Sequence, residues 1–263
     1  MDGGGPGSDE DGGRPDLFAD VLSAETKEEI RGAHDKFGAR RRQVGGACVR
    51  QDYIAVEGTG GAVYDSALVL SDFLLGGGID SDVDLAQSLI IELGTGTGAV
   101  STALAHRLGY DAPGERLRLV ATDGCIDAFR LAKANFAQLK LQPPAVEVRR
   151  LRWGDDADLE GLLSLVAPAA LAAQSTVILM SDVIYPGSDL DALITCLRSL
   201  TEALRPLFVM AHVDRDQENE AQFLRRVEEE LPLSVSMRLR WTPHVEPEAG
   251  STGTLYVHVF EPR

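Results

Sequence analysis

From residue 63 onward, apolar segments with two different spacings alternate along the chain. Short apolar runs typical of buried strands are followed by longer segments in which apolar residues recur every three or four positions, as in helices. The predicted strand and helix pairs are 88–93 with 98–109, 117–122 with 125–140, 145–151 with 157–166, 176–181 with 189–204, and 207–213 with 216–230, preceded by a helix at 63–75. This alternation predicts a mostly parallel, doubly wound sheet.

The C-terminal segment breaks the alternation. Two apolar segments, 233–241 and 254–261, are joined by a loop with no helical pattern. Two consecutive strands without a helix between them pair antiparallel, because only an antiparallel pair can be closed by a simple loop. The sequence therefore predicts an α/β, Rossmann-like sheet of seven strands, with this antiparallel strand pair at one edge.

The N-terminal part carries weaker patterns. Residues 1–15 consist almost entirely of glycine, proline and acidic residues, and we expect a disordered tail. The rest, 16–263, is expected to form one domain, with a helix and hairpin in 16–62 before a core at 63–263. The helix is predicted at 26–37 with Thr26 as N-cap and Glu29 completing a capping box. The Arg40–Arg42 run is interpreted as a solvated face, with a nuclear signal as the alternative.

Composition limits the class of protein. A chain of 263 residues is long enough for one α/β domain, and its formal charge of −16, from 41 acids and 25 bases, argues against a general affinity for nucleic acid and suits a basic partner. The three cysteines form no C-x-x-C pair, so neither a disulfide framework nor a metal site is predicted. With no membrane-length apolar run and no signal-peptide pattern, we expect a soluble monomer in the cytoplasm, with the nucleus as an alternative location.

A glycine-rich loop, "ELGTGTG" at 92–98, joins the first predicted strand of the alternating region to its helix. Such a strand, loop and helix unit is a cofactor cradle in α/β folds. Two cofactors compete for it: a dinucleotide, through the relaxed pattern Gly94-x-Gly96-x-x-Ala99, and S-adenosylmethionine. Glu92 favours the second, because a carboxylate would repel a pyrophosphate but attract a ligand that carries a sulfonium and an amino group.

Polar residues follow the later strands, where ligands bind in doubly wound sheets. Asp123 ends the second strand of the alternation and is placed to accept hydrogen bonds from a ribose. Trp153 follows the third and could cover an adenine, the alternative being a core tryptophan. Ser181, Asp182 and Tyr185 follow the fourth and are expected beside the sulfonium; the alternative is an aspartate that caps the next helix and a tyrosine that packs on it.

Taken in order, these motifs resemble those of the family-16 seven-strand methyltransferases over residues 50–261. The matching pieces are "RQDY", "VYDSALVL", "ELGTGTG", "ATDG", "LRWGD", the D-x-x-Y motif "SDVIY" and "YVHVFE". The chain departs from the family at Tyr64, where a tryptophan is usual. The resemblance implies an S-adenosylmethionine site lined by Tyr64, Gly94, Thr95, Gly96, Asp123, Trp153 and Ser181, with Glu92 at its methionine end and with Asp182 and Tyr185 between cofactor and acceptor.

The resemblance also implies a reaction. Members of this family methylate lysine side chains of proteins such as heat-shock chaperones, AAA ATPases and translation factors, so we expect a protein-lysine methyltransferase with a substrate of that kind. A small-molecule or histidine N-methyltransferase stays open, as does a cofactor-binding partner without activity. A nicotinamide dehydrogenase is disfavoured by Glu92 and by the C-terminal strand pair.

Overall fold

We analysed the protein in a computed structural model, which describes residues 22–32, 40–52, 54–56, 59–110, 116–141, 144–242 and 253–263. The predicted tail at 1–15 lies outside the described residues, as does the end of the first predicted helix at 33–37. None of the helices in the described ranges has the length and hydropathy that crossing a membrane requires.

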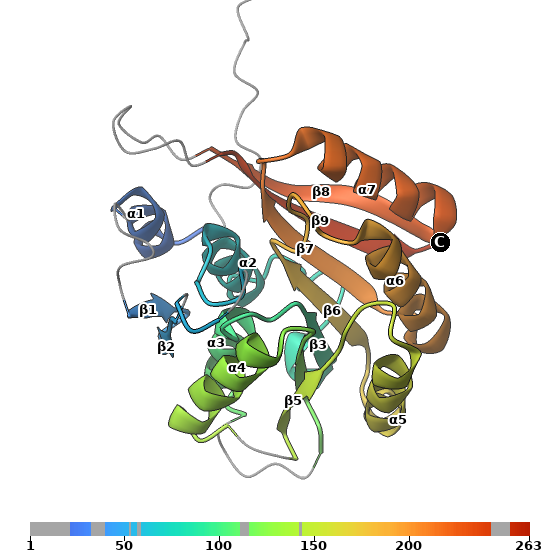
Figure 1. The fold of residues 1–263 in the computed structure, drawn as a ribbon, viewed down its shortest axis with the longest axis horizontal. Helices are drawn as coiled ribbons and strands as arrows, with labels where there is room; N and C mark the ends of the chain where they lie inside the picture. Colours follow the sequence, from blue (N-terminus) through green and yellow to red (C-terminus); the bar gives the residue numbers. More distant parts are fainter. Residues whose placement is uncertain are drawn as a thin grey trace, which may run out of the picture.

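A seven-stranded sheet forms the centre of the molecule (Figure 1). Its strands are β3 (Leu89–Leu93), β4 (Leu119–Asp123), β5 (Val146–Arg150), β6 (Thr176–Ser181), β7 (Leu207–Val213), β8 (Leu233–Trp241) and β9 (Leu255–Pro262), in the spatial order β5-β4-β3-β6-β7-β9-β8. The strands from β3 to β7 pair parallel, whereas β9 lies between β7 and β8 and pairs antiparallel with both. The predicted α/β sheet with an antiparallel C-terminal pair is confirmed.

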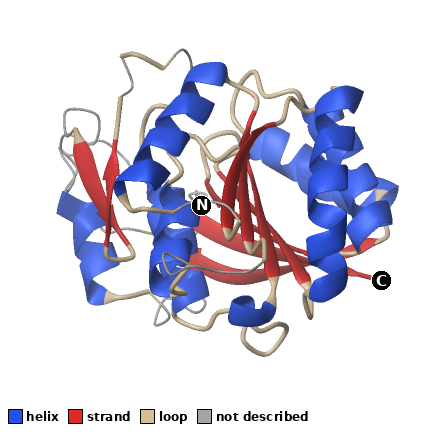
Figure 2. Ribbon diagram, turned by 90° about the horizontal axis from the view of Figure 1, so that it is seen from below, coloured by secondary structure: helices blue, strands red, loops and turns tan. Residues whose placement is uncertain are grey.

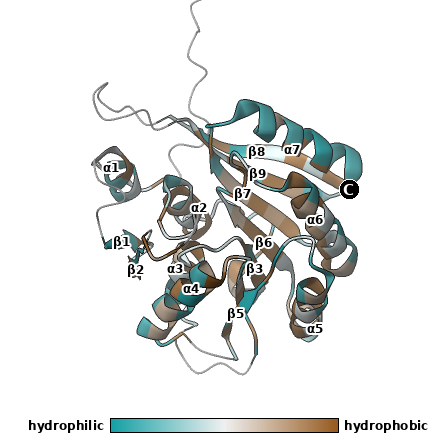
Figure 3. Cartoon of the chain, in the orientation of Figure 1, coloured by the Kyte–Doolittle hydropathy of each residue, from teal (hydrophilic) through white to brown (hydrophobic). Residues whose placement is uncertain are grey.

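Helices cover both faces of this sheet (Figures 1 and 2). One face carries α2 (Asp65–Leu75), α3 (Ala99–Arg107) and α4 (Ile126–Gln138), and the other carries α5 (Asp156–Ala172), α6 (Leu190–Leu204) and α7 (Gln217–Glu230). The inner strands are apolar on both faces, as expected for parallel strands between two helical layers, and Figure 3 shows them as the most hydrophobic part of the chain. Helix α5 runs past the predicted end at 166, since the alanines around Pro168 favour helix.

The N-terminal part packs against α2 and α3. Helix α1 (Ala24–Gly32) precedes a hairpin of β1 (Arg41–Val44) and β2 (Ala47–Arg50), and a short 3-10 turn, η2 (Leu85–Gln87), leads into β3. The prediction that Thr26 caps the first helix is wrong, because the hydroxyl of Ser23 accepts a hydrogen bond from Thr26 N–H at 3.1 Å. Ser23 is therefore the residue that caps the helix, three positions before the amide that it binds, and Thr26 lies inside the helix.

The interpretation of Arg40–Arg42 as a solvated run is wrong at its last residue. Arg42 is 4% exposed, whereas Arg40 and Arg41 are exposed. Its guanidinium donates to the carbonyl of Val63 at 2.9 Å and to Glu29 of α1 at 3.1 Å, and it lies 3.8 Å from Asp65. The alternation of the strand turns this side chain inward, where an ion pair and a carbonyl compensate for its burial.

The order of the strands determines where a ligand can bind. From β3 the chain moves outward through β4 to β5, then returns to the other side of β3 with β6 and continues to β7. The topological switch point therefore lies between β3 and β6. The carboxyl ends of β3, β4 and β6 meet there, and these are the ends that carry the glycine loop, Asp123 and Ser181.

Candidate active site

The loop between β3 and α3 has the backbone geometry that its glycines predict. Gly94, Gly96 and Gly98 have φ angles of +68°, +54° and +79°. A side chain at Gly96 would also bring its Cβ within 3.1 Å of the carbonyl oxygen of Gly60, so the segment before α2 lies directly against this loop. The loop thus combines positive φ with close backbone approach, as its glycines require.

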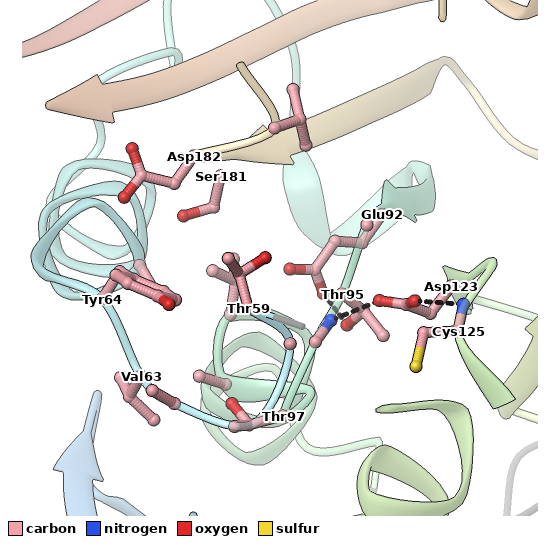
Figure 4. A pocket seen from close by; sticks show the side chains of 18 of the residues that line it. Thr59, Val63, Tyr64, Glu92, Thr95, Thr97, Asp123, Cys125, Ser181 and Asp182 are labelled. Atoms are coloured by element: carbon pink, nitrogen blue, oxygen red, sulfur yellow. Dashed lines mark hydrogen bonds between the residues drawn. The ribbon is translucent and has the colours of Figure 1, made fainter. Parts of the chain in front are cut away.

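A cavity of about 300 Å³ opens beside this loop (Figure 4). All ten residues predicted for the site line it: Tyr64, Glu92, Gly94, Thr95, Gly96, Asp123, Trp153, Ser181, Asp182 and Tyr185. The structure therefore brings together residues from four strand ends and from the N-terminus of α2. The volume of the cavity lies at the lower end of the range typical of small-molecule sites.

Glu92 is buried at the floor of the cavity, with 1% of its surface exposed. Its Oε2 accepts hydrogen bonds from Thr95 Oγ1 at 2.6 Å, from the backbone N–H of Ser101 at 3.1 Å and from the Ser101 hydroxyl. Burial raises the pKa of Glu92 to about 7, although these hydrogen bonds oppose the rise. The carboxylate thus ties the glycine loop and α3 to β3, and it is a negative group that a cation in the cavity would stabilise.

Asp123 ends β4 and lies beside the glycine loop, next to Thr95 and Cys125 (Figure 4). Its Oδ2 accepts from Gly96 N–H and its Oδ1 from Cys125 N–H, both at 2.8 Å. Burial raises the pKa of this carboxyl, and the two amides lower it. Each oxygen keeps a second lone pair, so the side chain can still accept two hydrogen bonds, as the predicted contact with a ribose diol requires.

Trp153 covers a third side of the cavity. It is half-buried and packs against the core on the α5 and α6 side of the sheet. A Cβ on Gly94 would lie 3.5 Å from its ring, so the indole and the glycine loop are in close contact. Trp153 therefore both lines the cavity and packs on the core, and its role as a cover for adenine stays a prediction.

Asp182 lies directly after β6 in a left-handed backbone conformation, with φ +54°. Its Oδ1 accepts from Val213 N–H at 3.1 Å, and its Oδ2 is 2.8 Å from the guanidinium of Arg215. Burial raises the pKa of Asp182, whereas Arg215 lowers it. The residue that caps the next helix is Asp189, which accepts from Ala192 N–H, so the alternative of Asp182 as a helix cap is wrong.

Two tyrosines accompany Asp182 at this end of the cavity. Tyr64 is the residue before the first turn of α2, and the guanidinium of Arg215 lies 5.3 Å from its ring centroid. Burial raises the pKa of the Tyr64 phenol, and Arg215 lowers it. Tyr185 is half-buried in the loop after β6. At the end of β6, the hydroxyl of Ser181 lies 3.1 Å from the hydroxyl of Ser66 in α2. This end therefore has aromatic walls and one ion pair.

The charges of the cavity fit one of the two candidate cofactors. Among the described residues that line it are three carboxylates, those of Glu92, Asp123 and Asp182, and no lysine, arginine or histidine. Arg215, outside the lining, pairs with Asp182, but no salt bridge joins Glu92 or Asp123 to another described residue. Their carboxylates would repel a pyrophosphate, whereas a sulfonium and an amino group match them. The residues present thus fit S-adenosylmethionine, and the assignment of Asp123 to its ribose and of Glu92 to its cationic end stays a prediction.

Several lining residues were not predicted from the sequence. Thr59 and Gly60 line the cavity from the segment before α2. Arg215, in the loop after β7, is not a lining residue, but it pairs with Asp182, which is one. A signal for Arg215 was present, because it follows a parallel strand by two residues, the position that identified the other polar groups. Thr59 and Gly60 gave no such signal, since they belong to an irregular segment.

Solved structures with a similar fold include a putative transferase and methyltransferases. The chain is similar to a putative transferase from Pyrococcus horikoshii, with 12% identity and a TM-score of 0.51 over 85% of this chain and 72% of that one. A methyltransferase from Agrobacterium tumefaciens gives 14% identity and 0.50 over 85% and 70%. A putative methyltransferase solved with S-adenosylhomocysteine gives 11% and 0.52 over 84% and 56%. At these identities the likeness establishes the fold.

The family assignment comes from the sequence itself. The model of methyltransferase family 16, described as lysine methyltransferase, matches residues 49–230. This range begins in β2 and ends with α7, and it includes every residue that lines the cavity. The chain belongs to this family, and it is an S-adenosylmethionine-dependent methyltransferase.

Proposed function

We propose that this enzyme transfers a methyl group from S-adenosylmethionine to the side-chain amine of a lysine in a protein substrate. The observation that carries the proposal is the end of the cavity where Asp182, Tyr185 and Tyr64 meet, because it combines a carboxylate with two aromatic walls. Aromatic walls accept the long apolar stem of a lysine and tolerate the methylated cation that the reaction forms. The description of the matched family supports the same acceptor.

In the proposed reaction the lone pair of the amine forms a bond to the methyl carbon while the carbon–sulfur bond breaks. The products are S-adenosylhomocysteine and a methylated ammonium, which then loses a proton to solvent. Nitrogen, carbon and sulfur must align, so the main contribution of the protein is positioning. In this proposal Asp182, whose carboxylate accepts a hydrogen bond from Val213 of β7, holds the acceptor end in place, and Tyr185 forms one wall.

The amine must also arrive without its proton, since an ammonium has no lone pair. A water-poor pocket favours the neutral form, because burial disfavours the charged one. The left-handed conformation at Asp182 costs energy in a residue that is not glycine, and such strain is concentrated at functional sites. A positioning role for this aspartate accounts for it.

The partner in this proposal is a basic region of a protein of the chaperone, AAA ATPase or translation-factor type. The formal charge of −16 supports a basic segment around the target lysine and opposes a nucleic acid substrate. We propose further that the enzyme acts as a monomer in the cytoplasm, with the nucleus as the alternative. These assignments rest on charge and on family resemblance.

The proposal is tested by incubating the protein with radiolabelled S-adenosylmethionine and an extract of cells that lack it. Label in a protein band that yields methyllysine after acid hydrolysis is the expected result. Label confined to small molecules, to nucleic acid or to methylhistidine would refute the lysine assignment. A catalytically inactive chain would give no label while still binding S-adenosylhomocysteine.

A variant at Asp182 separates binding from chemistry. Asp182→Asn keeps the shape and tolerates the left-handed backbone, so S-adenosylhomocysteine affinity should stay within a few-fold of wild type. Methyl transfer in a single turnover should fall by roughly ten-fold or more, the effect of lost alignment. Asp189→Asn, at the cap of α6, is the matched control and should leave turnover unchanged. Normal turnover in Asp182→Asn would remove this residue from the site.

A further inference from the structure

Arg215 lies next to the acceptor end of the cavity and is not one of the residues that line it. Its guanidinium is 2.8 Å from Oδ2 of Asp182 and lies over the ring of Tyr64 at 5.3 Å. The side chain is 42% exposed, whereas that of Asp182 is 5% exposed. The arginine thus covers the buried carboxylate of Asp182 from the solvent side, and it contacts Tyr64, which lines the cavity.

The backbone around Arg215 is held by buried groups. Its N–H donates to Oε1 of Glu220 in α7 at 3.3 Å, and Oε2 of the same glutamate is 3.4 Å from Nδ1 of His212 in β7. Glu220 and His212 are 7% and 2% exposed. The loop after β7 therefore has a fixed start, and the position of the guanidinium is set by the fold as well as by its own ion pair.

The pairing determines the charge that an incoming amine meets. An unpaired Asp182 carboxylate would stabilise an ammonium, because a lysine amine is more basic than a carboxylate by about six pH units. With Arg215 in place, the pair of Arg215 and Asp182 has no net charge, so it does not stabilise the ammonium over the neutral amine. The other ionisable groups around the pair on neighbouring elements are Tyr64 before α2, Tyr185 after β6, Glu220 of α7 and His212 of β7. On the same loop, Asp214 and Asp216 accept hydrogen bonds from Gln217 and Asn219.

We propose that Arg215 is a positioning residue of the acceptor site, which neutralises Asp182 so that the site receives the neutral amine in preference to the ammonium. This inference rests on the proposed amine methylation and names the group that prepares the acceptor for it. Since only the neutral amine has a lone pair, a site that stabilised the ammonium would bind substrate in its unreactive form. Arg215 therefore favours the reaction without touching the methyl group.

A binding experiment tests the inference without turnover. Sinefungin is an S-adenosylmethionine analogue in which an amine-bearing carbon replaces the methylated sulfur, so its amine takes the place of the methyl group. Calorimetry with sinefungin and S-adenosylhomocysteine measures how the site treats that amine. The informative quantity is the affinity for sinefungin divided by the affinity for S-adenosylhomocysteine. Near neutral pH this ratio should be about ten-fold or more higher in Arg215→Gln than in wild type, because the Asp182 carboxylate is then unpaired.

Three comparisons sharpen this result. Arg215→Lys keeps the charge and should keep the wild-type ratio of the two affinities. Arg198→Gln removes an arginine of similar exposure, 40%, which lies away from the cavity and pairs with Glu230 at a distance of 2.9 Å. This variant should leave the ratio of the two affinities unchanged. In the wild-type protein, the affinity for sinefungin relative to that for S-adenosylhomocysteine should rise with pH, because the amine of sinefungin then loses its proton. An unchanged ratio in Arg215→Gln, or a wild-type ratio that falls with pH, would overturn the inference.

The pH profile of methyl transfer gives a second readout once an acceptor protein is known. The midpoint of the rise in kcat/KM with pH should move up by about one unit or more in Arg215→Gln and return in Arg215→Lys. A merely structural arginine would lower the melting temperature and the amount of active enzyme but leave the midpoint in place. If the wild-type enzyme methylates no amine, the proposed function fails, and the sinefungin comparison still decides the role of Arg215.

Discussion

Replacing Glu92 with glutamine should change the pH dependence of folding stability. The carboxyl is buried below the glycine loop, where Thr95 and Ser101 donate hydrogen bonds to it. Burial nevertheless raises its pKa from 4.5 to about 7. A glutamine has nearly the same shape and can still accept from these donors, but it does not ionise.

The sign follows from proton binding. A carboxyl whose pKa is higher in the folded than in the unfolded chain binds its proton more tightly when folded. The stability that this group contributes is therefore fully present below pH 4.5 and is lost as pH rises through about 7. At about 1.4 kcal/mol for each pH unit, Glu92 should lower the free energy of unfolding by roughly 2–3 kcal/mol between about pH 5 and pH 8.

The measurement is urea unfolding of the wild-type protein and of Glu92→Gln, without cofactor, at several pH values across this range. Other carboxyl groups titrate in both proteins, so the informative quantity is the difference in unfolding free energy between the two at each pH. That difference should shift in favour of Glu92→Gln by roughly 2–3 kcal/mol from the acidic to the basic end. A difference independent of pH would show that Glu92 titrates normally in the folded protein, and a shift in favour of wild type would reverse the argument.

Three further predictions concern the cofactor, the acceptor wall and the N-terminal hairpin. Asp123→Ala should weaken S-adenosylhomocysteine binding by about 1–3 kcal/mol in calorimetry, because the ribose loses a charged acceptor and Gly96 N–H loses its partner; unchanged affinity would place the ribose elsewhere. Tyr185→Phe should be mild and Tyr185→Ala severe in single-turnover methyl transfer, because the ring forms the wall; equal losses would assign the function to the hydroxyl. Arg42→Met should lower the free energy of unfolding in urea by roughly 3 kcal/mol, since it removes a buried ion pair, whereas the exposed neighbour Arg41→Met should stay within about 0.5 kcal/mol; equal effects would contradict the burial argument.

The sequence by itself determined the elements and the cofactor loop. Strand and helix spacings are local properties, so every strand from β3 to β9 was predicted within a few residues of its observed bounds. The glycines at 94, 96 and 98 were legible for the same reason, because positive φ is a constraint on single residues. The polar residues after each strand identified the site, since parallel strands bring their carboxyl ends to one edge of the sheet.

Only the tertiary structure decided which of these residues meet and which are buried. The insertion of β9 between β7 and β8 depends on pairing between distant strands, and no local pattern encodes that order. Arg42 looked like part of a solvated basic run until the hairpin packed against α1 and α2 and gave it buried partners. In the same way Arg215 pairs with Asp182, thirty-three positions earlier in the chain, because β6 and β7 are neighbours in the sheet. Contacts of this kind depend on packing between elements, and a single sequence read locally does not contain them.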